Sequence, residues 1–448
     1  MEIVALLRQY IWTKWLARRF STREQLESWQ SAQVQAMLRR ILPDSPFYRE
    51  RLGVLDPADW RKLEPIDKKL MMAHFDELNT RGIAKEDAFR VALQAETTRD
   101  FAPQLEGITV GLSSGTSGNR GLFLVGPQEQ AKWAGTILAK ALPGPLWAEH
   151  RIAFFLRANS NLYTAVNRRR IRFSFFDLQK PLQEHLLTLN EYQPTVLVAP
   201  ASMLRLLATQ QRKGVLRISP VKIISVAEVL DPLDEAYIRD TFGQLIHQIY
   251  QCTEGLLAVT CAYGTLHVNE DLIVMEKEYL DEHKERFFPI LTDFSRVTQP
   301  IIRYRLNDIL TEKRSPCPCG SVFTALEKIE GRADDLFWFR GREGGRFISV
   351  FPDFIRRAVI STSDVIEEYT VRQLSPYKLE VSLRLRDGDW PRIEEQVRSS
   401  LEAIIREHQG EVPVIAFTPY ELQLGTKKLR RVERMFTPDE QQEDNRCP

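Results

Sequence analysis

The segment LSSGTSGNRG, residues 112–121, has the clearest chemical meaning of any stretch in this sequence. Its glycines let backbone N–H groups approach phosphate oxygens without a Cβ atom in the way, and its hydroxyl groups add donors. It is not a P-loop, because no lysine follows Gly118. The segment predicts a phosphate-binding loop, with a polar surface turn as the alternative. The predicted phosphate-binding residues are Ser113, Ser114, Gly115, Thr116, Ser117 and Gly118.

Downstream of this loop, short apolar runs alternate with amphipathic helices. The expected strands are residues 152–156, 196–199, 221–226 and 246–250, and the expected helices are residues 181–192 and 201–213. Another helix is expected to begin at Asp231-Pro232, with aspartate as N-cap and proline at the first helical position. This alternation predicts an α/β fold whose parallel sheet is covered by helices on both faces. Ligands of such sheets bind beyond the carboxyl ends of the strands.

The last hundred or so residues have a different pattern. Residues 379–385 alternate apolar and polar side chains, as in a half-exposed strand. Apolar residues from Ile393 to Ile405 then follow helical spacing up to Gly410, and residues 412–417 resemble a strand. We therefore expect a small α+β domain after a break near residues 331–335. The predicted domains are residues 1–333 and 334–448.

The composition is that of an ordinary globular protein. The 448 residues include 61 Lys plus Arg and 60 Asp plus Glu, so the net charge of +1 argues against a generic nucleic-acid binder. Five cysteines exclude a disulfide scaffold and favour a reducing compartment, which predicts a cytoplasmic location. No apolar run approaches the roughly 18 residues of a transmembrane segment.

Residues 1–20 form an amphipathic stretch. Glu2, Arg8, Lys14, Arg18 and Arg19 interrupt any signal-peptide core. The favoured interpretation is a basic surface helix packed on the body, because a charged face is usually solvated. A helix lying on a membrane surface is the alternative.

Further motifs follow one another in an order that resembles a known family. They are DSPFYRE at 44–50, SVAE at 225–228, YQCTE at 250–254, RYRLND at 303–308, CPCG at 317–320, GRADD at 331–335 and GTKKLRRV at 425–432. Together with the loop at 112–121, they resemble the adenylate-forming ligases of the acyl-CoA synthetase superfamily. The resemblance is greatest to the phenylacetate–CoA ligase branch, and it extends over nearly the whole chain.

The resemblance implies a fold and a reaction. It implies a large N-terminal AMP-binding domain, with parallel sheets flanked by helices, and a small mobile α+β C-terminal domain. A carboxylic acid and MgATP would give an acyl-adenylate and pyrophosphate, and a thiol of CoA or an acyl carrier protein would then displace AMP. The apolar, aromatic stretch 154–176 favours an aryl or other apolar acid. A non-thiol acceptor, or nucleotide binding with little catalysis, remains as an alternative, and a homodimer is a candidate assembly.

The resemblance also assigns nucleotide-binding roles. Ala227 and Glu228 would edge the adenine, and Tyr250 would offer it a flat ring, although Tyr250 is equally explained as a core aromatic. Asp308 would accept both ribose hydroxyls, with a turn residue as the alternative. Arg332 would reach the ribose or a phosphate, or would simply pair with a neighbouring aspartate.

Three residues are implied to be catalytic: Thr253, Glu254 and Lys428. Glu254 offers a hard carboxylate oxygen for Mg²⁺, although it is also explained as a surface residue after a strand. Lys428 would stabilise charge at the α-phosphate and the acyl oxygen. It belongs to a run of cations at 427–431, which is also typical of a solvated face, and Lys427 is a neighbouring candidate.

A second group of residues has the composition of a metal site. Cys261, His267, Cys317 and Cys319 supply three thiolates and one imidazole, a common tetrahedral set for structural zinc. The similar branch carries zinc at these positions in some members. The alternative is two buried cysteines, a surface histidine and a Cys-Pro-Cys-Gly turn. Cys252 lies outside the set and is a candidate for the acyl pocket.

Three positions depart from the family pattern. The usual lysine after the phosphate loop is replaced by Asn119-Arg120, which leaves Arg120 as a substitute cation. Gln251 replaces a glycine at the floor of the acyl pocket, and Asn307 replaces the glycine before Asp308. These departures indicate a divergent subgroup, so phenylacetate itself is not assigned as the substrate.

Overall fold

The computed structural model describes residues 2–98, 103–113, 120–156, 169–280, 282–342, 346–363, 365–386, 388–421 and 430–436. The chain divides into two compact units. Unit 1 comprises Met1–Leu230, Asp234–Leu306 and Thr311–Lys328, and unit 2 comprises Asp231–Leu233, Asn307–Leu310 and Ile329–Pro448. The last segment of unit 2 begins at Ile329, close to the domain boundary predicted at 333/334. That boundary stays a prediction.

The described helices are α1 (Glu2–Leu16), α2 (Arg23–Ile41), α3 (Pro46–Leu52), η1 (Pro57–Lys62), α4 (Lys68–Ala73), α5 (Phe75–Leu78), α6 (Lys85–Thr98), α7 (Pro127–Ala141), α9 (Leu182–Tyr192), α10 (Ala201–Arg212), α11 (Pro232–Phe242), η2 (Ala333–Asp335), α12 (Pro352–Ile360) and α13 (Trp390–Glu407). The described strands are β1 (Gln104–Leu105), β2 (Ile108–Leu112), β3 (Leu122–Val125), β4 (His150–Leu156), β5 (Ile171–Asp177), β6 (Val196–Ala199), β7 (Lys222–Val226), β8 (Ile246–Cys252), β9 (Gly255–Thr260), β10 (Leu266–Val268), β11 (Ile273–Tyr279), β12 (Arg286–Asp293), β13 (Ile301–Arg305), β14 (Asp308–Glu312), β15 (Ala325–Arg332), β16 (Phe337–Arg340), β17 (Phe347–Val350), β18 (Ile366–Ser375), β19 (Lys378–Leu385), β20 (Val414–Pro419) and β21 (Val432–Arg434).

The principal sheet has two halves with different strand directions. Its order is β11-β12-β14-β15-β10-β9-β8-β7-β6-β4-β5, with β13 paired to β12. From β5 to β8 the strands are parallel, as the alternating sequence predicts. From β8 to β10 the pairing is antiparallel, as it is between β11 and β12. The α/β prediction is therefore confirmed, while the parallel arrangement covers only the half that contains helices between strands.

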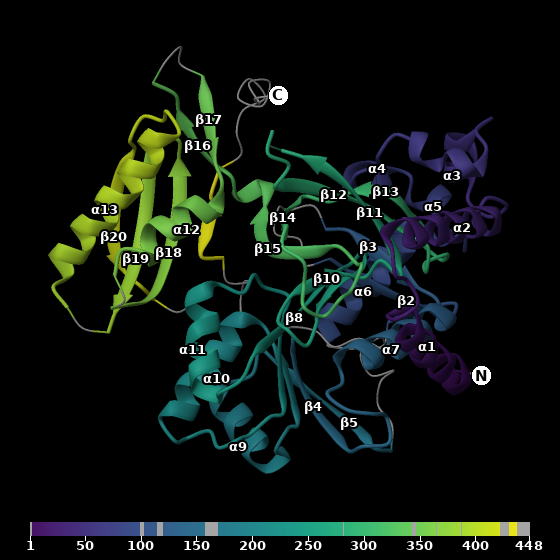
Figure 1. Ribbon diagram of the computed structural model, residues 1–448, viewed down its shortest axis with the longest axis horizontal. Helices are drawn as coiled ribbons and strands as arrows, with labels where there is room; N and C mark the ends of the chain where they lie inside the picture. The colour runs from purple at the N-terminus through teal and green to yellow at the C-terminus, as the bar shows by residue number, and fades with distance from the viewer. Residues whose placement is uncertain are drawn as a thin grey trace. The chain divides into compact units, whose positions relative to one another are not determined.

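Helices cover both faces of the parallel half (Figure 1). One face packs Phe155, Leu197 and Ile223 against α9, α10 and α11. The other face packs Phe154 and Val198 against α1 and α7. Alternate residues of a strand point to opposite faces, so continuous apolar runs are the expected sequence for strands buried on both sides.

A separate sheet has the order β1-β2-β3, and its strands β2 and β3 precede and follow the predicted phosphate loop in the sequence. Strands β2 and β3 are antiparallel, and Leu112 pairs with Leu122 at the end of the hairpin where the loop joins the two strands. Their inner side chains, including Val110 and Leu124, pack with Ala88 and Ala92 of α6. This packing fixes the two strand ends between which the predicted phosphate loop is attached.

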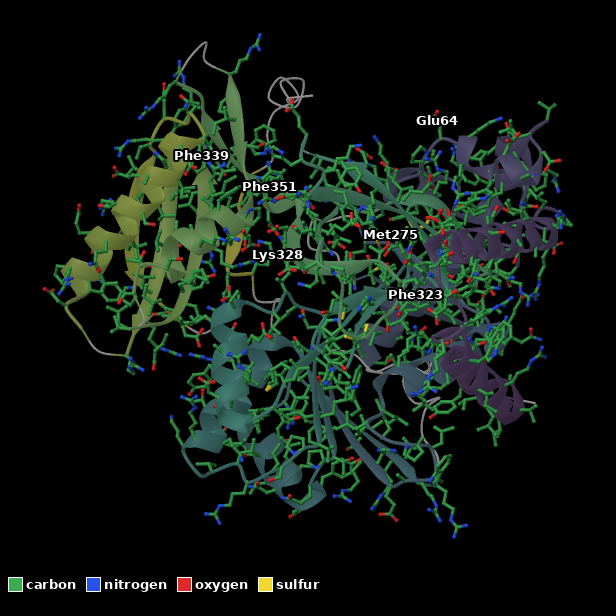
Figure 2. The ribbon with its side chains drawn as sticks, viewed as in Figure 1. Glu64, Met275, Phe323, Lys328, Phe339 and Phe351 are labelled. Carbon is green, nitrogen blue, oxygen red and sulfur yellow. The ribbon has the colours of Figure 1, made fainter. Side chains whose placement is uncertain are left out.

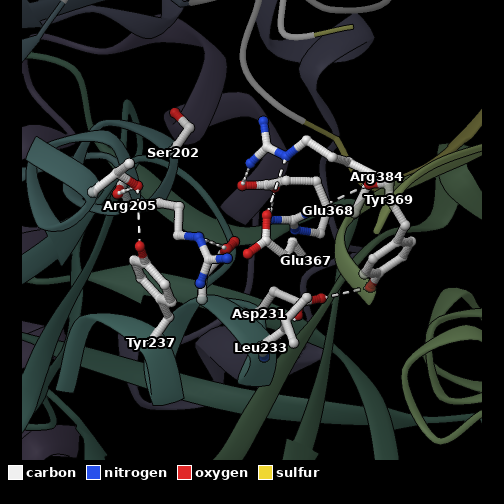
Figure 3. Close-up of polar contacts among 12 residues, drawn as sticks. Ser202, Arg205, Asp231, Leu233, Tyr237, Glu367, Glu368, Tyr369 and Arg384 are labelled. Atoms are coloured by element: carbon white, nitrogen blue, oxygen red, sulfur yellow. Dashed lines mark hydrogen bonds and ion pairs between the residues drawn. The ribbon is translucent and has the colours of Figure 1, made fainter. Parts of the chain in front are cut away.

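Unit 2 contains the predicted α+β arrangement. Its sheet has the order β20-β19-β18-β21. Helix α13 buries Ile393, Val397, Leu401 and Ile405, which confirms the helical spacing. Within the same unit, the Tyr369 hydroxyl donates to Asp231 Oδ2 at 2.7 Å (Figure 3). Burial raises the pKa of Tyr369 well above its usual value, and the Asp231 charge adds to the effect. Among the described residues, none of the helices is both long enough and apolar enough to cross a bilayer.

Candidate functional site

The base of the predicted phosphate loop is closed by its two flanking residues. Ser113 N donates to Gly121 O at 2.7 Å, and Gly121 N donates to Ser113 Oγ at 2.7 Å. Lys68 Nζ donates to the same Ser113 Oγ at 3.2 Å. A Cβ atom on Gly121 would lie 2.9 Å from Lys68 Cε, so glycine leaves room for this lysine. The predicted residues Ser114, Gly115, Thr116, Ser117 and Gly118 lie outside the described residues.

Arg120 has a different partner from the one proposed for it. Its guanidinium forms an ion pair with Glu96 of α6 and donates to Glu96 Oε2 at 2.8 Å. The Glu96 hydrogen bond is the main cause of the raised pKa of Arg120. Arg120 Nε also donates to Ser113 O at 3.5 Å, so Lys68 and Arg120 both contact the base of the loop, and the charge of Arg120 is paired with Glu96.

The Thr253–Glu254 turn joins β8 to β9 and carries two of the predicted catalytic residues. Thr253 Oγ1 donates to Glu254 Oε2 at 2.9 Å, and Glu254 is buried. The buried Tyr304 hydroxyl also hydrogen-bonds the Glu254 carboxylate. Burial, followed by the charge of Glu254, raises the pKa of Tyr304 far above its usual value. Tyr304 therefore stays a neutral donor that orients Glu254.

Arg296 connects this turn to the loop hairpin. Its guanidinium is buried and donates to Thr253 O at 2.6 Å and to Leu124 O of β3 at 3.1 Å. Gln299 extends the same connection, because its side chain accepts from Leu124 N and donates to Leu122 O. The hairpin and the Glu254 turn are thus held together by side chains that hydrogen-bond to backbone groups.

A second carboxylate lies behind the turn. Asp293 Oδ1 accepts from Ser295 N at 2.8 Å and from Ser295 Oγ at 2.6 Å. Its Oδ2 atom would lie 3.0 Å from a Cβ on Gly255, so the glycine permits this close approach. Complete burial raises the pKa of Asp293 to about 6, against the opposing effect of the Arg296 charge. Near neutral pH this group therefore lowers the stability of the folded state.

The segment after β7 has an unusual backbone. Ala227 has φ of +65°, and Glu228 N donates to Val226 O at 2.8 Å. A positive φ at the centre of an i to i+2 hydrogen bond is the strained γ-turn. Glu228 Oε2 accepts from Ser202 N in the first turn of α10 at 2.9 Å. The predicted adenine edge is therefore a rigid turn at the carboxyl end of a parallel strand, next to β8 with its half-buried Tyr250.

The remaining predicted nucleotide residues belong to unit 2. Arg332 Nε lies 3.7 Å from Asp308 Oδ1, so Arg332 pairs with the predicted ribose carboxylate. Arg430 forms an ion pair with Asp335 at 3.0 Å, and burial raises the pKa of Asp335 to about 6 in spite of that cation. The buried Arg431 pairs with Glu368 at 2.9 Å. Two members of the cation run at 427–431 are therefore structural, while Lys427 and Lys428 lie outside the described residues.

The two predicted ligand pairs, Cys261 with His267 and Cys317 with Cys319, come together in unit 1. The four ligand atoms lie within 4.8 Å of one another. Cys261 Sγ is 3.7 Å from Cys317 Sγ, and Cys319 Sγ is 3.3 Å from His267 Nε2. His267 Nδ1 lies 3.1 Å from the carbonyl of Phe323, a residue labelled in Figure 2. Since a carbonyl only accepts, the Nδ1 atom carries the proton and Nε2 is free to bind a metal.

Sequence reasoning missed Lys68, Arg296 and the role of Tyr304. Tyr304 lies inside the RYRLND motif, but the motif does not indicate that Tyr304 contacts Glu254. Lys68 follows Asp67, whose carboxylate caps α4 by accepting from Leu70 N. The Asp67 N-cap predicts the start of a helix. Nothing in the neighbouring sequence indicates that the Lys68 side chain contacts a loop far along the chain.

The sequence and the structure were compared with those of known proteins. No family model matches the sequence, and no curated protein matches it. Solved structures do match. A 2-hydroxyisobutyryl-CoA ligase, in the postadenylation state with 2-HIB-AMP, has a TM-score of 0.66 and 16% identity, over 92% of this chain and 90% of that one. The GH3.15 acyl acid amido synthetase has a TM-score of 0.57 and 14% identity, over 89% of this chain and 86% of that one. The chain therefore has the fold of the adenylate-forming enzymes, as its motifs suggested.

Proposed function

We propose that the protein is an ATP-dependent acid ligase that activates a carboxylic acid as its acyl-adenylate. The observation that supports this most is the joining of the loop hairpin to the Thr253–Glu254 turn through Arg296. Within an adenylate-forming fold, this contact holds a phosphate loop and a metal-binding carboxylate at a fixed separation. A carboxylate oxygen of the substrate would attack the α-phosphorus of ATP, and the bond to pyrophosphate would break.

The polar groups suit these roles. Lys68 and Ser113 would contact phosphate oxygens at the base of the loop, where a cation and a hydroxyl donor already meet. Glu254 would hold Mg²⁺, because it is a buried carboxylate whose orientation is set by Thr253 and Tyr304. Mg²⁺ supplies charge neutralisation on the phosphates when bound. Ala227, Glu228, Tyr250, Asp308 and Arg332 stay the proposed nucleotide-binding residues, and Lys428 stays the proposed catalytic cation.

For the second step, we propose transfer of the acyl group to the thiol of CoA or of a carrier protein. The sulfur would attack the acyl carbon, AMP would leave with the bonding electrons, and the thiol proton would be released. The motif resemblance to the phenylacetate–CoA ligase branch and the structural likeness to a CoA ligase support this acceptor. An aryl or other apolar acid remains the proposed substrate class.

An amine acceptor is the second candidate. It is favoured by the structural likeness to an acyl acid amido synthetase, which is nearly as extensive in coverage. The two candidates share the adenylation step and differ in the nucleophile. Product analysis after incubation with ATP and an acid, with CoA or with an amino acid, separates them.

Structural zinc is proposed at the Cys/His cluster. Three sulfurs and one imidazole nitrogen converge there, and the Phe323 carbonyl fixes the histidine tautomer that leaves Nε2 free. Zinc would cross-link the end of β9, strand β10 and the loop before β15. Four protein ligands leave no open position, so the metal would have no part in the reaction.

The decisive experiment is carboxylate-dependent ATP–pyrophosphate exchange across a broad panel of acids. We expect exchange that depends on both the acid and Mg²⁺. Exchange that is absent with every acid, while ATP still binds, would support the remaining alternative of a nucleotide-binding protein with little catalysis. Metal analysis of protein purified without added zinc tests the cluster independently.

A further inference from the structure

Helix α1 has two faces that are both largely apolar. Its inner face packs on α7, where Leu6 is buried and Gln9 Nε2 donates to Thr136 Oγ1 at 3.1 Å. Gly135 of α7 lies so close to α1 that a Cβ atom there would be 2.4 Å from Leu6 O. The helix is therefore fixed to the body of unit 1, as the sequence predicts, and its other face is held outward.

The outward face carries exposed apolar side chains as well as the exposed basic residues that the favoured interpretation expects. Val4 is 70% exposed, Ile11 is 67% exposed and Trp15 is 47% exposed. These positions are seven and four residues apart, so they share one face of the helix, opposite Leu6 and Thr13. Leu7 and Trp12 widen the stripe, and the rings of Trp12 and Trp15 stack with centroids 4.7 Å apart.

Basic side chains lie within and beside this stripe. Arg8, four residues before Trp12 and seven before Trp15, lies among the apolar side chains, and exposed Lys14, Arg18 and Arg19 lie next to them, with Arg19 over the Trp15 ring at 4.7 Å. Within the part of the chain that the structure describes, no carboxylate pairs with any of these four cations. The outward face of α1 therefore combines exposed apolar side chains with positive charge.

Two further lysines lie near α1: Lys140, which is paired with Asp271 at 2.9 Å, and Lys222. The pKa of Lys14 is lowered by burial and by the charges of Arg18 and Lys140. Burial and the charge of Lys14 lower the pKa of Lys222 to about 8. Cations that depress one another's proton affinity gain most from an anionic partner, because such a partner relieves their mutual repulsion.

We propose that the outward face of α1 is a docking surface for an anionic phospholipid bilayer. The helix would lie in the plane of the interface. Val4, Ile11, Trp12 and Trp15 would enter the region between headgroups and acyl chains, and Arg8, Lys14, Arg18 and Arg19 would contact lipid phosphates. Tryptophan is suited to this depth, because its ring is apolar and its N–H group still finds polar partners. The inner face keeps its contacts with α7, so docking needs no unfolding of the protein.

The test uses the full chain and vesicles of phosphatidylcholine, with or without phosphatidylglycerol. We expect co-sedimentation with the vesicles that contain phosphatidylglycerol, and release at high salt. Trp12→Ser/Trp15→Ser should weaken binding by at least about tenfold. Arg8→Gln/Lys14→Gln should weaken it by about twenty-five-fold, from roughly fivefold for each cation near a charged membrane surface.

Two controls keep the outcome interpretable. Trp147→Ser changes a tryptophan that is 73% exposed and lies outside α1, and it should bind like the wild type. The thermal transition of Trp12→Ser/Trp15→Ser should match the wild type, since both side chains are outward. Absence of binding to phosphatidylglycerol vesicles would overturn the proposal. A concentration-dependent dimer that Trp12→Ser/Trp15→Ser abolishes would also overturn it, because the stripe would then be covered by a second copy.

Discussion

Strand β9 has a candidate cation site at each end, and the two sites are built in opposite ways. At one end, the Thr253–Glu254 turn holds a buried carboxylate through Thr253 and Tyr304. At the other end, Cys261 begins the cluster whose four ligand atoms lie within 4.8 Å of one another. The first site supplies few protein ligands, and the second supplies a complete set.

The difference separates two uses of a cation. A closed tetrahedral set stabilises the fold and excludes substrate, whereas a single carboxylate leaves most of the coordination sphere to phosphate oxygens and water. Loss of a cluster ligand should therefore lower stability, whereas loss of the Glu254 charge should lower activity. Each prediction below tests one side of that division, from the largest expected effect to the smallest.

Cys319→Ser is expected to have the largest effect. Loss of a zinc ligand should remove the metal and lower the free energy of unfolding by about 4 kcal/mol, because loss of a structural metal is among the most destabilising changes. Chemical denaturation and metal analysis measure the two losses. Cys252→Ser is the matched control, since Cys252 lies at the other end of the same hairpin and outside the cluster. Wild-type stability in Cys319→Ser would contradict the structural role proposed for zinc.

Glu254→Gln is expected to act on activity alone. Removing the charge while keeping the shape should lower ATP–pyrophosphate exchange by about 10²- to 10³-fold, the usual loss for one electrostatic group at a reaction centre. The unfolding transition and the zinc content should not change. Glu327→Gln removes an exposed carboxylate from β15 and should leave exchange unchanged. Wild-type exchange by Glu254→Gln would contradict the assignment.

Asp293→Asn tests whether the turn end costs stability. Burial raises the pKa of Asp293 in the folded protein to about 6, above its unfolded value of 3.8. This group therefore destabilises the fold progressively as the pH rises from about 4 to about 6, and fully above that range. The free energy of unfolding of Asp293→Asn, relative to that of the wild type, should therefore rise by roughly 1–3 kcal/mol from pH 4 to pH 7. Denaturation at both pH values measures it, and Asp240→Asn on the surface of α11 should show no such gain.

Lys68→Ala should have the smallest effect. Loss of a cation from the base of the loop should reduce kcat/KM for ATP by about tenfold, or about 1.4 kcal/mol, without changing zinc content. Lys69→Ala is the matched control, because Lys69 is the next residue of α4 and is exposed. An equal loss in both variants would show that Lys68 has no specific contact with the nucleotide.

Much of the parallel half of the fold could be predicted from local sequence. Residues 196–199 are buried without exception in β6, and the Asp231-Pro232 start of α11 follows a recognised N-terminal pattern. The antiparallel half was not predicted, because β9 to β15 are joined without helices, so no alternation of strand with helix marks them. The assignment of Asp231 to unit 2 was also beyond local rules, since it depends on Tyr369 far along the chain.

The candidate sites show the same limit. Cysteine and histidine have few common roles, so four of them in two close pairs predicted a cluster that the structure brings together. Arginine has many roles, so neither the pairing of Arg120 with Glu96 nor the carbonyl contacts of Arg296 could be read from neighbouring residues. Spacing along the chain therefore predicts the chemistry of a site only where the residue types have few common roles.

The placement of Lys68 also bears on how such a chain is detected. In this protein Lys68, a cation at the base of the loop, belongs to α4 and lies 45 residues before Ser113 in the sequence, and Gly121 provides the space for it. A search pattern that demands lysine within the loop passes over this chain, although the positive charge is retained in space. The predicted loop and Lys68 belong to separate segments of the chain, so a substitution in one leaves the other in place.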